Sequence, residues 1–365
     1  MAEHLDWYAE MRATSPVAPG DQPGLYDVFG YPEVRTALSD HANYSSARAM
    51  GGGGSVIGDS LIATDPPRHR QLRSIVDRAF TPRAVQALGP RIQQLADELL
   101  DQFSGAELDF VEKFAIPLPV LVIAELLGVP ASDRADFKRW SDAVITGDSR
   151  GMREMIGYFQ GLIAARRDAG TTEGDLLGAL LAAEGDGQRL NEREVLGFCV
   201  LLLVAGNETT TNLIGNTVQV LSEQPALRAR LNADPTLWPS AIEESLRFRS
   251  PVQCIFRATT TDIRLGGQDL PAGSYLRVWI GSANRDEAIF PDATAFDPTR
   301  TPNRHLAFGV GIHFCLGAPL ARLEAQIALT ALYRRFPELR AIPGRRIDYL
   351  PSLVVHGPTT LPVTW

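Results

Sequence analysis

The chain has 365 residues, 45% of them hydrophobic, and a formal net charge of −8 at pH 7. A chain of this length and composition can bury a sizeable core. The acidic balance excludes a nucleic-acid-binding protein that relies on a globally basic surface. No Ser- and Pro-rich linker divides the sequence, so we expect residues 1–365 to form a single domain.

The chain contains three cysteines, Cys199, Cys254 and Cys315, and none belongs to a C-x-x-C pair. An odd, sparse set argues against a disulfide framework and structural zinc, and it fits a reducing cytoplasm. The N-terminus is polar and acidic, unlike a signal peptide. The longest apolar run, around residues 200–205, falls far short of the ~20 residues that cross a bilayer. We therefore expect a soluble, cytoplasmic protein with no membrane partner.

Helical periodicity dominates the chain, and the strand-like patterns are short. The predicted helices are 4–13, 31–39, 67–77, 89–103, 118–127, 134–146, 151–169, 175–183, 191–223, 238–247 and 318–336. The predicted strands are 25–28, 263–265, 275–280 and 353–355. We expect a mainly α fold, a helical body with a small β region. The run Gly51-Gly52-Gly53-Gly54-Ser55 predicts a mobile loop.

The helix expected over 191–223 is the longest, and its centre is apolar on nearly all sides, as in a helix that crosses a large domain. Within it, the run Ala205-Gly206-Asn207-Glu208-Thr209-Thr210 places polar side chains in apolar surroundings. A glycine here costs ~1 kcal/mol of helix propensity, and a Thr hydroxyl can bond a carbonyl one turn earlier. The pattern predicts either a local opening for a small molecule and water or a kinked core helix with a solvated Glu208.

A second motif, Phe308-Gly309-Val310-Gly311-Ile312-His313-Phe314-Cys315-Leu316-Gly317, places one cysteine among glycines just before a predicted helix. Free backbone N–H groups and the helix dipole at this position favour a thiolate. The glycines let the backbone approach a large flat group. Such a thiolate suits the axial ligand of a haem iron. A buried free cysteine is the alternative for a cysteine taken alone.

This loop resembles the haem-binding loop of the cytochrome P450 family at Phe308, Gly309, Gly311, His313, Cys315 and Gly317. The resemblance extends from residue 31 to residue 355, although the chain is short for the family. It implies a P450-like fold with haem b (iron protoporphyrin IX) between the long central helix and the loop. Cys315 would be the iron ligand, with Phe308 and Gly317 beside the cofactor.

The same resemblance implies roles for residues outside the loop. Thr209 would supply a hydroxyl near dioxygen, Glu208 would relay protons from solvent, and Ala205 and Gly206 would lie against the haem face. The residues implied to bind the haem propionates are His69, Arg73, Arg257 and His313. Without the resemblance, His69 and Arg73 are an ordinary surface pair four residues apart.

Glu244 and Arg247 lie three apart on a predicted helix, and Arg300 follows later. The resemblance implies that these three side chains form a buried ion network that holds the cysteine loop. Bidentate Arg–carboxylate geometry suits this purpose. An exposed helix pair worth about 0.3–0.5 kcal/mol is the alternative for this spacing.

The implied activity is hydroxylation or epoxidation of a lipophilic small molecule such as a fatty acid, terpenoid or polyketide-like compound. We expect mostly apolar pocket walls. They would come from residues 48–62, 141–158, 202–206, 252–256 and 353–355. Ser141 and Asp142 could orient a substrate there, although surface exposure is the simpler interpretation.

The sequence has no G-x-G-x-x-G fingerprint and no flavin domain, so electrons must come from a ferredoxin or flavodoxin. Such acidic donors would dock on a local basic face. The residues predicted for that face are Arg68, Arg70, Arg322 and Arg334.

Three other functions remain open on the sequence. A haem-thiolate sensor without turnover would keep Cys315 but would not need Glu208 and Thr209. A peroxide-driven peroxygenase is the second alternative, although enzymes of that kind in the family generally lack the acid–alcohol pair. A cysteine hydrolase would need a His–Cys dyad, and His313 is near Cys315 in sequence.

Overall fold

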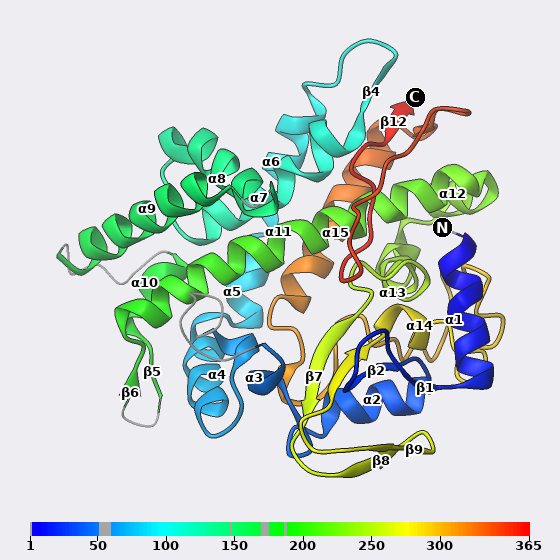
Figure 1. Cartoon of the computed structure of the whole chain (residues 1–365). Helices are drawn as coiled ribbons and strands as arrows, with labels where there is room; N and C mark the ends of the chain where they lie inside the picture. The colour runs from blue at the N-terminus through cyan, green and yellow to red at the C-terminus, as the bar shows by residue number, and fades with distance from the viewer. Residues whose placement is uncertain (1, 51–59, 147, 169–174, 186–187) are drawn as a thin grey trace.

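A computed structural model describes residues 2–50, 60–146, 148–168, 175–185 and 188–365. The predicted loop at residues 51–55 lies outside the described residues, as do the side chains of Ser141 and Asp142. The described chain forms a helical body beside a smaller β region (Figure 1). Similar structures confirm the expected mainly α fold.

The helical body surrounds α11 (Glu192–Glu223), which contacts α7, α8, α9, α13 and α15. The other helices of the body are α4 (Arg68–Ala79), α5 (Pro82–Ala87), α6 (Gly89–Leu100), α7 (Pro117–Leu126), α8 (Arg134–Thr146), α9 (Ser149–Asp168), α10 (Leu176–Ala182), α12 (Pro225–Ala233), α13 (Trp238–Phe248) and α15 (Ala318–Arg335). A capping box starts α11: the Asn191 side chain accepts the Glu194 N–H, and the Glu194 side chain accepts the Asn191 N–H.

By length and composition α11 could cross a membrane, but 67% of its most apolar window is buried inside the protein. Valine, leucine and isoleucine from all sides of α11 belong to the largest hydrophobic cluster. We therefore describe α11 as the core helix of the body, which agrees with the apolar pattern seen in the sequence.

The β region centres on a five-stranded sheet in the order β1-β2-β10-β7-β3. Its strands are β1 (Val17–Pro19), β2 (Leu25–Val28), β3 (Tyr44–Ser45), β7 (Ile255–Thr259) and β10 (Tyr275–Val278). Only β2 and β10 pair in parallel. The helices α1 (Ala2–Thr14), α2 (Tyr31–Ser39), α3 (Ser46–Ala49) and α14 (Ile280–Ala283) lie beside this sheet (Figure 1).

Three smaller sheets complete the β structure of the described residues. A three-stranded sheet in the order β11-β12-β4 brings the C-terminal segment against the helical body. Its strands are β4 (Glu107–Asp109), β11 (Arg340–Ala341) and β12 (Pro362–Thr364). Two hairpins pair β5 (Glu184–Gly185) with β6 (Gln188–Arg189) and β8 (Ile263–Leu265) with β9 (Gln268–Leu270).

Every predicted helix is present within a few residues of its expected bounds, but the strand predictions were less accurate. The strand expected over 275–280 ends at Val278, because the chain turns into α14 at Ile280. The strand expected over 353–355 is wrong: that segment makes only an isolated bridge, from Val355 to Val252. The sequence analysis missed β7, which carries Arg257.

Candidate haem site

The cysteine loop lies between the β region and the start of α15. Gly311 has φ +78°, and a Cβ there would come 3.0 Å from the Cα of Ser39 at the end of α2. Glycine is therefore required at this position both by backbone conformation and by close packing. The Cys315 N–H donates to the Phe308 carbonyl at 2.9 Å, which closes the loop on itself.

The sulfur of Cys315 accepts hydrogen bonds from the backbone N–H groups of Gly317, the N-cap of α15, and Ala318, its first residue. Burial raises the pKa of the Cys315 thiol, whereas these two N–H groups and the nearby Arg73 and Arg322 act in the opposite direction. The predicted placement of the cysteine at a helix N-terminus is thus present in the structure. A metal ion at the sulfur would supply the charge that offsets the cost of burying a thiolate.

Three predicted propionate ligands come together from three separate segments. The rings of His69 (α4) and His313 lie 4.3 Å apart between centroids. Burial, followed by repulsion from Arg257, His69 and Arg73, lowers the pKa of His313 to about 3. Ser46, which the sequence analysis missed, contacts His313 Nε2 at 3.1 Å. The cluster is rich in donors and in positive charge.

Two members of the cluster lack the partners that burial demands. The Nε2 atom of His69 is buried and has no hydrogen-bond partner among the described residues. Arg257 is 6% exposed, and its guanidinium donates only to the Phe256 carbonyl within the described structure. Burial lowers the pKa of Arg257 to about 10. Two carboxylates such as the haem propionates would satisfy both groups, so the residues present fit haem.

Arg73, the fourth predicted propionate ligand, has partners of its own. Its Nη1 donates to the Phe314 carbonyl at 2.8 Å, and its Nε pairs with Asp77 at 2.9 Å. Arg73 therefore ties α4 to the residue that precedes Cys315. Its role toward a propionate remains a prediction.

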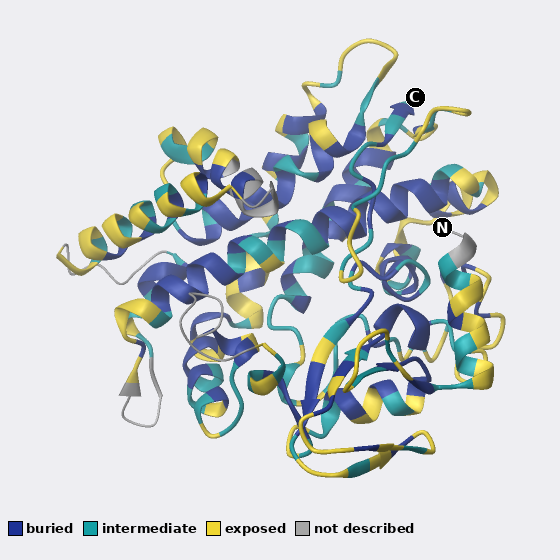
Figure 2. Ribbon diagram, viewed as in Figure 1, coloured by how far each residue is buried: buried dark blue, intermediate teal, exposed yellow. Residues whose placement is uncertain are grey.

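The middle of α11 is less buried than residues 195–201 and 210–221 on either side of it, and Figure 2 shows it as a stretch of intermediate burial between dark blue segments. Ala205 is exposed, and Glu208 and Thr209 are half-buried. The Thr209 hydroxyl donates to the Ala205 carbonyl at 2.7 Å, as the sequence pattern suggested, yet the helix runs unbroken from 192 to 223. Burial raises the pKa of Glu208.

Gly206 faces a neighbouring helix. A Cβ on Gly206 would come 3.0 Å from Cδ1 of Ile123 in α7, so glycine allows α7 and α11 to approach closely. This packing accounts for the residue without a cofactor. Contact of Gly206 with haem stays a prediction.

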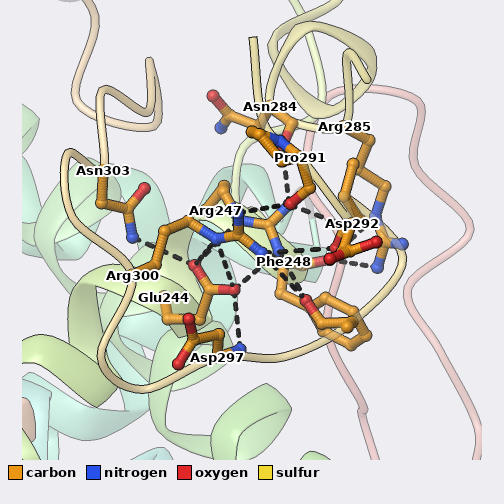
Figure 3. A network of polar contacts seen from close by, with 12 residues as sticks. Glu244, Arg247, Phe248, Asn284, Arg285, Pro291, Asp292, Asp297, Arg300 and Asn303 are labelled. Carbon is orange, nitrogen blue, oxygen red and sulfur yellow. Dashed lines mark hydrogen bonds and ion pairs between the residues drawn. The ribbon is translucent and has the colours of Figure 1, made fainter. Parts of the chain in front are cut away.

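The expected ion network around Glu244 is present and buried (Figure 3). The Glu244 carboxylate accepts two bonds from Arg247, at 2.7 and 2.8 Å, and further bonds from Arg300, Asn303 and the Asp297 backbone. Arg247 also donates to the carbonyls of Asn284, Ala293 and Ala295. The alternative, an exposed helix pair, is excluded because both side chains are 0% exposed.

A second network beside the loop was missed by the sequence analysis. Glu243 pairs in bidentate fashion with Arg322, at 2.7 and 2.8 Å, and contacts His305 Nε2 at 3.1 Å. The Arg322 guanidinium lies 4.5 Å from the centroid of the Phe308 ring. The adjacent glutamates 243 and 244 were the available signal, because neighbours on a helix face different directions.

The four arginines predicted for an electron-donor face differ in their exposure and in their ion pairs. Arg322 is committed to Glu243 and Phe308, and Arg68 pairs with Glu194. Arg334 is 69% exposed with a long 3.8 Å pair to Asp97, and Arg70 is exposed.

Exposed apolar side chains mark several of the predicted pocket walls. Met50, Ile62, Phe256, Leu353 and Val354 are all exposed, although each is large and apolar. They lie on or beside α3, η1 (Leu61–Ala63), β7 and the 353–355 segment, and α3 contacts both η1 and β7. Grouped exposed apolar residues indicate a binding surface.

Comparisons with known proteins agree with this geometry. The cytochrome P450 family model matches residues 236–355. The cytochrome P450 monooxygenase PikC of Streptomyces venezuelae is 41% identical over 386 residues, covering 100% of this chain and 91% of PikC. The 6-deoxyerythronolide B hydroxylase of Saccharopolyspora erythraea is 38% identical, covering 99% of this chain and 96% of the hydroxylase.

A solved structure gives the same result. The crystal structure of CYP109E1 from Bacillus megaterium in complex with testosterone superposes with a TM-score of 0.92 at 41% identity, covering 99% of this chain and 98% of that one. Together with the cysteine loop, the donor cluster and the partly exposed middle of α11, these similarities establish that the chain belongs to the cytochrome P450 family, as a haem b monooxygenase.

Proposed function

We propose that this monooxygenase hydroxylates or epoxidises a bulky alicyclic or macrocyclic lipophilic molecule of the polyketide or steroid type. The observation that carries the proposal is the group of exposed apolar side chains at Met50, Ile62, Phe256 and Leu353. Such a surface binds mainly by removing apolar groups from water. Two relatives support it by name: a 6-deoxyerythronolide B hydroxylase and a P450 in complex with testosterone.

We assign the site residues as follows. Haem, when bound, supplies the activation of dioxygen and the transfer of one oxygen atom. Cys315 is the iron ligand, and Phe308, Gly317 and Ala205 lie against the cofactor. His69, Arg257 and His313 hold the propionates, because His69 Nε2 has no partner and the Arg257 guanidinium donates only to the Phe256 carbonyl among the described residues. Arg73 adds positive charge at the same cluster.

On α11, Thr209 and Glu208 handle protons. The Thr209 hydroxyl gives its hydrogen to the Ala205 carbonyl, so its oxygen is oriented to accept a hydrogen bond at the opening. Burial raises the pKa of Glu208, so this carboxyl group holds a proton more readily than an exposed one. A group of this kind can pass protons from solvent toward the reacting oxygen.

The proposal includes an electron donor and a cellular location for the enzyme. Electrons come from a separate ferredoxin or flavodoxin that docks on a local basic face; Arg70 and Arg334, on separate helices, are the freer of the predicted basic residues. The three cysteines form no disulfide, which suits the cytoplasm, and we propose that the enzyme works there as a single-domain protein.

A spectroscopic titration tests the substrate class. Testosterone and 6-deoxyerythronolide B should shift the Soret band of the ferric protein in a saturable way, and a straight-chain fatty acid should do so more weakly. Phe256→Ala should weaken the binding of both ring compounds. Tyr275, an exposed aromatic residue on neighbouring β10, is the control, and Tyr275→Ala should leave their binding unchanged. Tighter binding of the fatty acid than of both ring compounds would overturn the proposal.

The same spectra check the iron ligand. Reduced wild-type protein with carbon monoxide should show the strongly red-shifted Soret band of thiolate ligation. Cys315→Ser should lose this band. Cys254→Ser should keep it, because Cys254 only donates to the Leu353 carbonyl.

A further inference from the structure

Two arginines at the C-terminal end of α13 carry more positive charge than the described carboxylates neutralise. The Arg249 side chain is 9% exposed and pairs with Glu223 through Nη2 at 2.6 Å. Its Nε and Nη1 atoms are buried and have no hydrogen-bond partner among the described residues. A buried N–H that is part of a charged group is costly to leave unpaired.

Arg285 lies close by and has no carboxylate in contact within the described structure. Its guanidinium stacks on Phe248, 4.2 Å from the ring centroid, and donates Nε and Nη2 to the Phe248 carbonyl (Figure 3). Burial, followed by repulsion from Arg247, Arg249 and Arg12, lowers the pKa of Arg285 to about 9.

The nearby carboxylates are already engaged. Glu244 is bound by Arg247 and Arg300, and Glu287 by Arg12. Glu223 meets Arg249 through Nη2 alone. The local excess of positive charge therefore has no counterpart in the described part of the chain.

Both arginines line a small cavity between α1, α13 and the C-terminal segment, which we call the Arg249–Arg285 cavity. Its volume is about 10 Å³, and His4, His356 and Gln253 also line it. The His356 Nε2 atom is buried without a partner among the described residues. Donors from two arginines and one histidine thus surround a space that holds one atom-sized guest.

We infer that the Arg249–Arg285 cavity binds a chloride ion. A water molecule could accept hydrogen bonds from the same donors, but it would not offset their charge. A space of about 10 Å³ has room for about one water-sized guest, so a monatomic anion fits it more readily than sulfate, phosphate or a carboxylate. A monatomic anion satisfies both requirements, and it joins α1, α13 and the C-terminal segment at one point.

Thermal unfolding of the haem-loaded protein tests the inference. At constant ionic strength, sodium chloride replaces sodium gluconate, whose anion is too large for the cavity. Chloride at ten times its Kd should raise Tm by about 2 °C, and Tm should then rise with the logarithm of the chloride concentration, because an ion that binds only the folded state stabilises it.

Arg285→Gln should abolish the chloride-dependent rise; because it also removes the hydrogen bonds to the Phe248 carbonyl, the quantity compared is the difference in Tm between chloride and gluconate, not Tm itself. Arg345→Gln is the matched control: Arg345 is 59% exposed and pairs with Glu107, so the rise should remain. An equal rise in both variants, or no rise in the wild type, would overturn the inference.

A crystal of the unmodified protein soaked in sodium bromide gives a second test that does not depend on a variant folding. Bromide replaces chloride and scatters anomalously. An anomalous peak between Arg249 and Arg285 is the expected result. A cavity that holds ordinary water density and no anomalous signal would refute the site.

Discussion

Thr209 shows how a single hydroxyl can be oriented by its own helix. A threonine that bonds the carbonyl four residues earlier neither breaks α11 nor leaves its hydrogen free. The hydroxyl oxygen is therefore left free to accept a hydrogen bond in the half-buried middle of the helix, beside the exposed Ala205. Glu208, the next residue back, is half-buried, and burial raises its pKa.

Replacement of Thr209 tests this arrangement. Thr209→Ala should uncouple oxygen consumption from product formation, with peroxide released in place of product. The reason is that the variant lacks the hydroxyl oxygen that accepts a hydrogen bond during proton delivery. The fraction of consumed electrons recovered in product is the measurement. Thr209→Ser keeps the hydroxyl and should restore most of the coupling. A fully coupled alanine variant would contradict the proton-handling role.

At the scale of elements, α13 contacts two different segments of the chain, because its two adjacent glutamates face different directions. Glu244 binds the 284–303 segment through Arg247, Arg300 and Asn303. Glu243 binds the start of α15 through Arg322 and the segment before the cysteine loop through His305. His305 accepts the Ala307 N–H at Nδ1, so its Nε2–H donates to Glu243.

Substitution of the two glutamates should lower the free energy of unfolding by very different amounts. Glu244→Gln leaves buried Arg247 without its counter-charge, so the free energy of unfolding should fall by about 3–5 kcal/mol. Glu243→Gln affects a pair that is 29% and 38% exposed, so it should cost about 1 kcal/mol or less. Urea unfolding of both variants is the measurement. Equal losses would contradict the assignment of Glu244 to a buried network.

Glu243 also predicts a response to acid. Burial alone would raise its pKa, but hydrogen bonds from Arg322 and His305 outweigh it and lower the pKa to about 2, against an ordinary value of 4.5. Its contribution to stability is therefore present above about pH 4.5 and is lost as the pH falls toward 2. In Glu243→Gln this part of the acid sensitivity should be absent.

At the scale of the whole molecule, α15 carries an ionisable group into the core of the helical body. Glu324 is 2% exposed, and its Oε1 has no partner among the described residues. Burial raises the pKa of Glu324 to about 8, so the folded protein holds this proton at neutral pH. The surrounding helices therefore pack against a neutral carboxylic acid rather than a charge.

Stability of the haem-loaded protein should consequently decline with rising pH. Between the ordinary pKa of 4.5 and about 8 the folded state binds more protons at Glu324 than the unfolded state, so the free energy of unfolding falls across this window. Glu324→Gln should flatten the fall, and Glu10→Gln, at an exposed position, should not. The measurement is Tm from pH 5 to pH 8 for both variants. A slope of Tm against pH in Glu324→Gln that equals the wild-type slope would contradict the prediction.

The helices, the cysteine loop and the family could all be predicted from the amino-acid order alone. Helical periodicity and the order Phe308 to Gly317 are local patterns, so short windows of sequence are enough to find them. The bounds of α2 and α8 agree residue for residue with the prediction for this reason. Short strands such as β7 were missed because pairing with distant partners, rather than their own pattern, decides them.

Which charged side chains contact each other could not be predicted in this way, because the contacts join distant parts of the chain. Arg73 reaches the Phe314 carbonyl across 241 residues, and Arg322 reaches Glu243 across 79. Whether an arginine is a free surface charge, a structural partner or an unpaired donor depends on such long-range contacts and on the burial they create. Local sequence reveals neither the long-range contacts nor the burial, because both arise when segments far apart in the chain pack together and exclude water from the space between them.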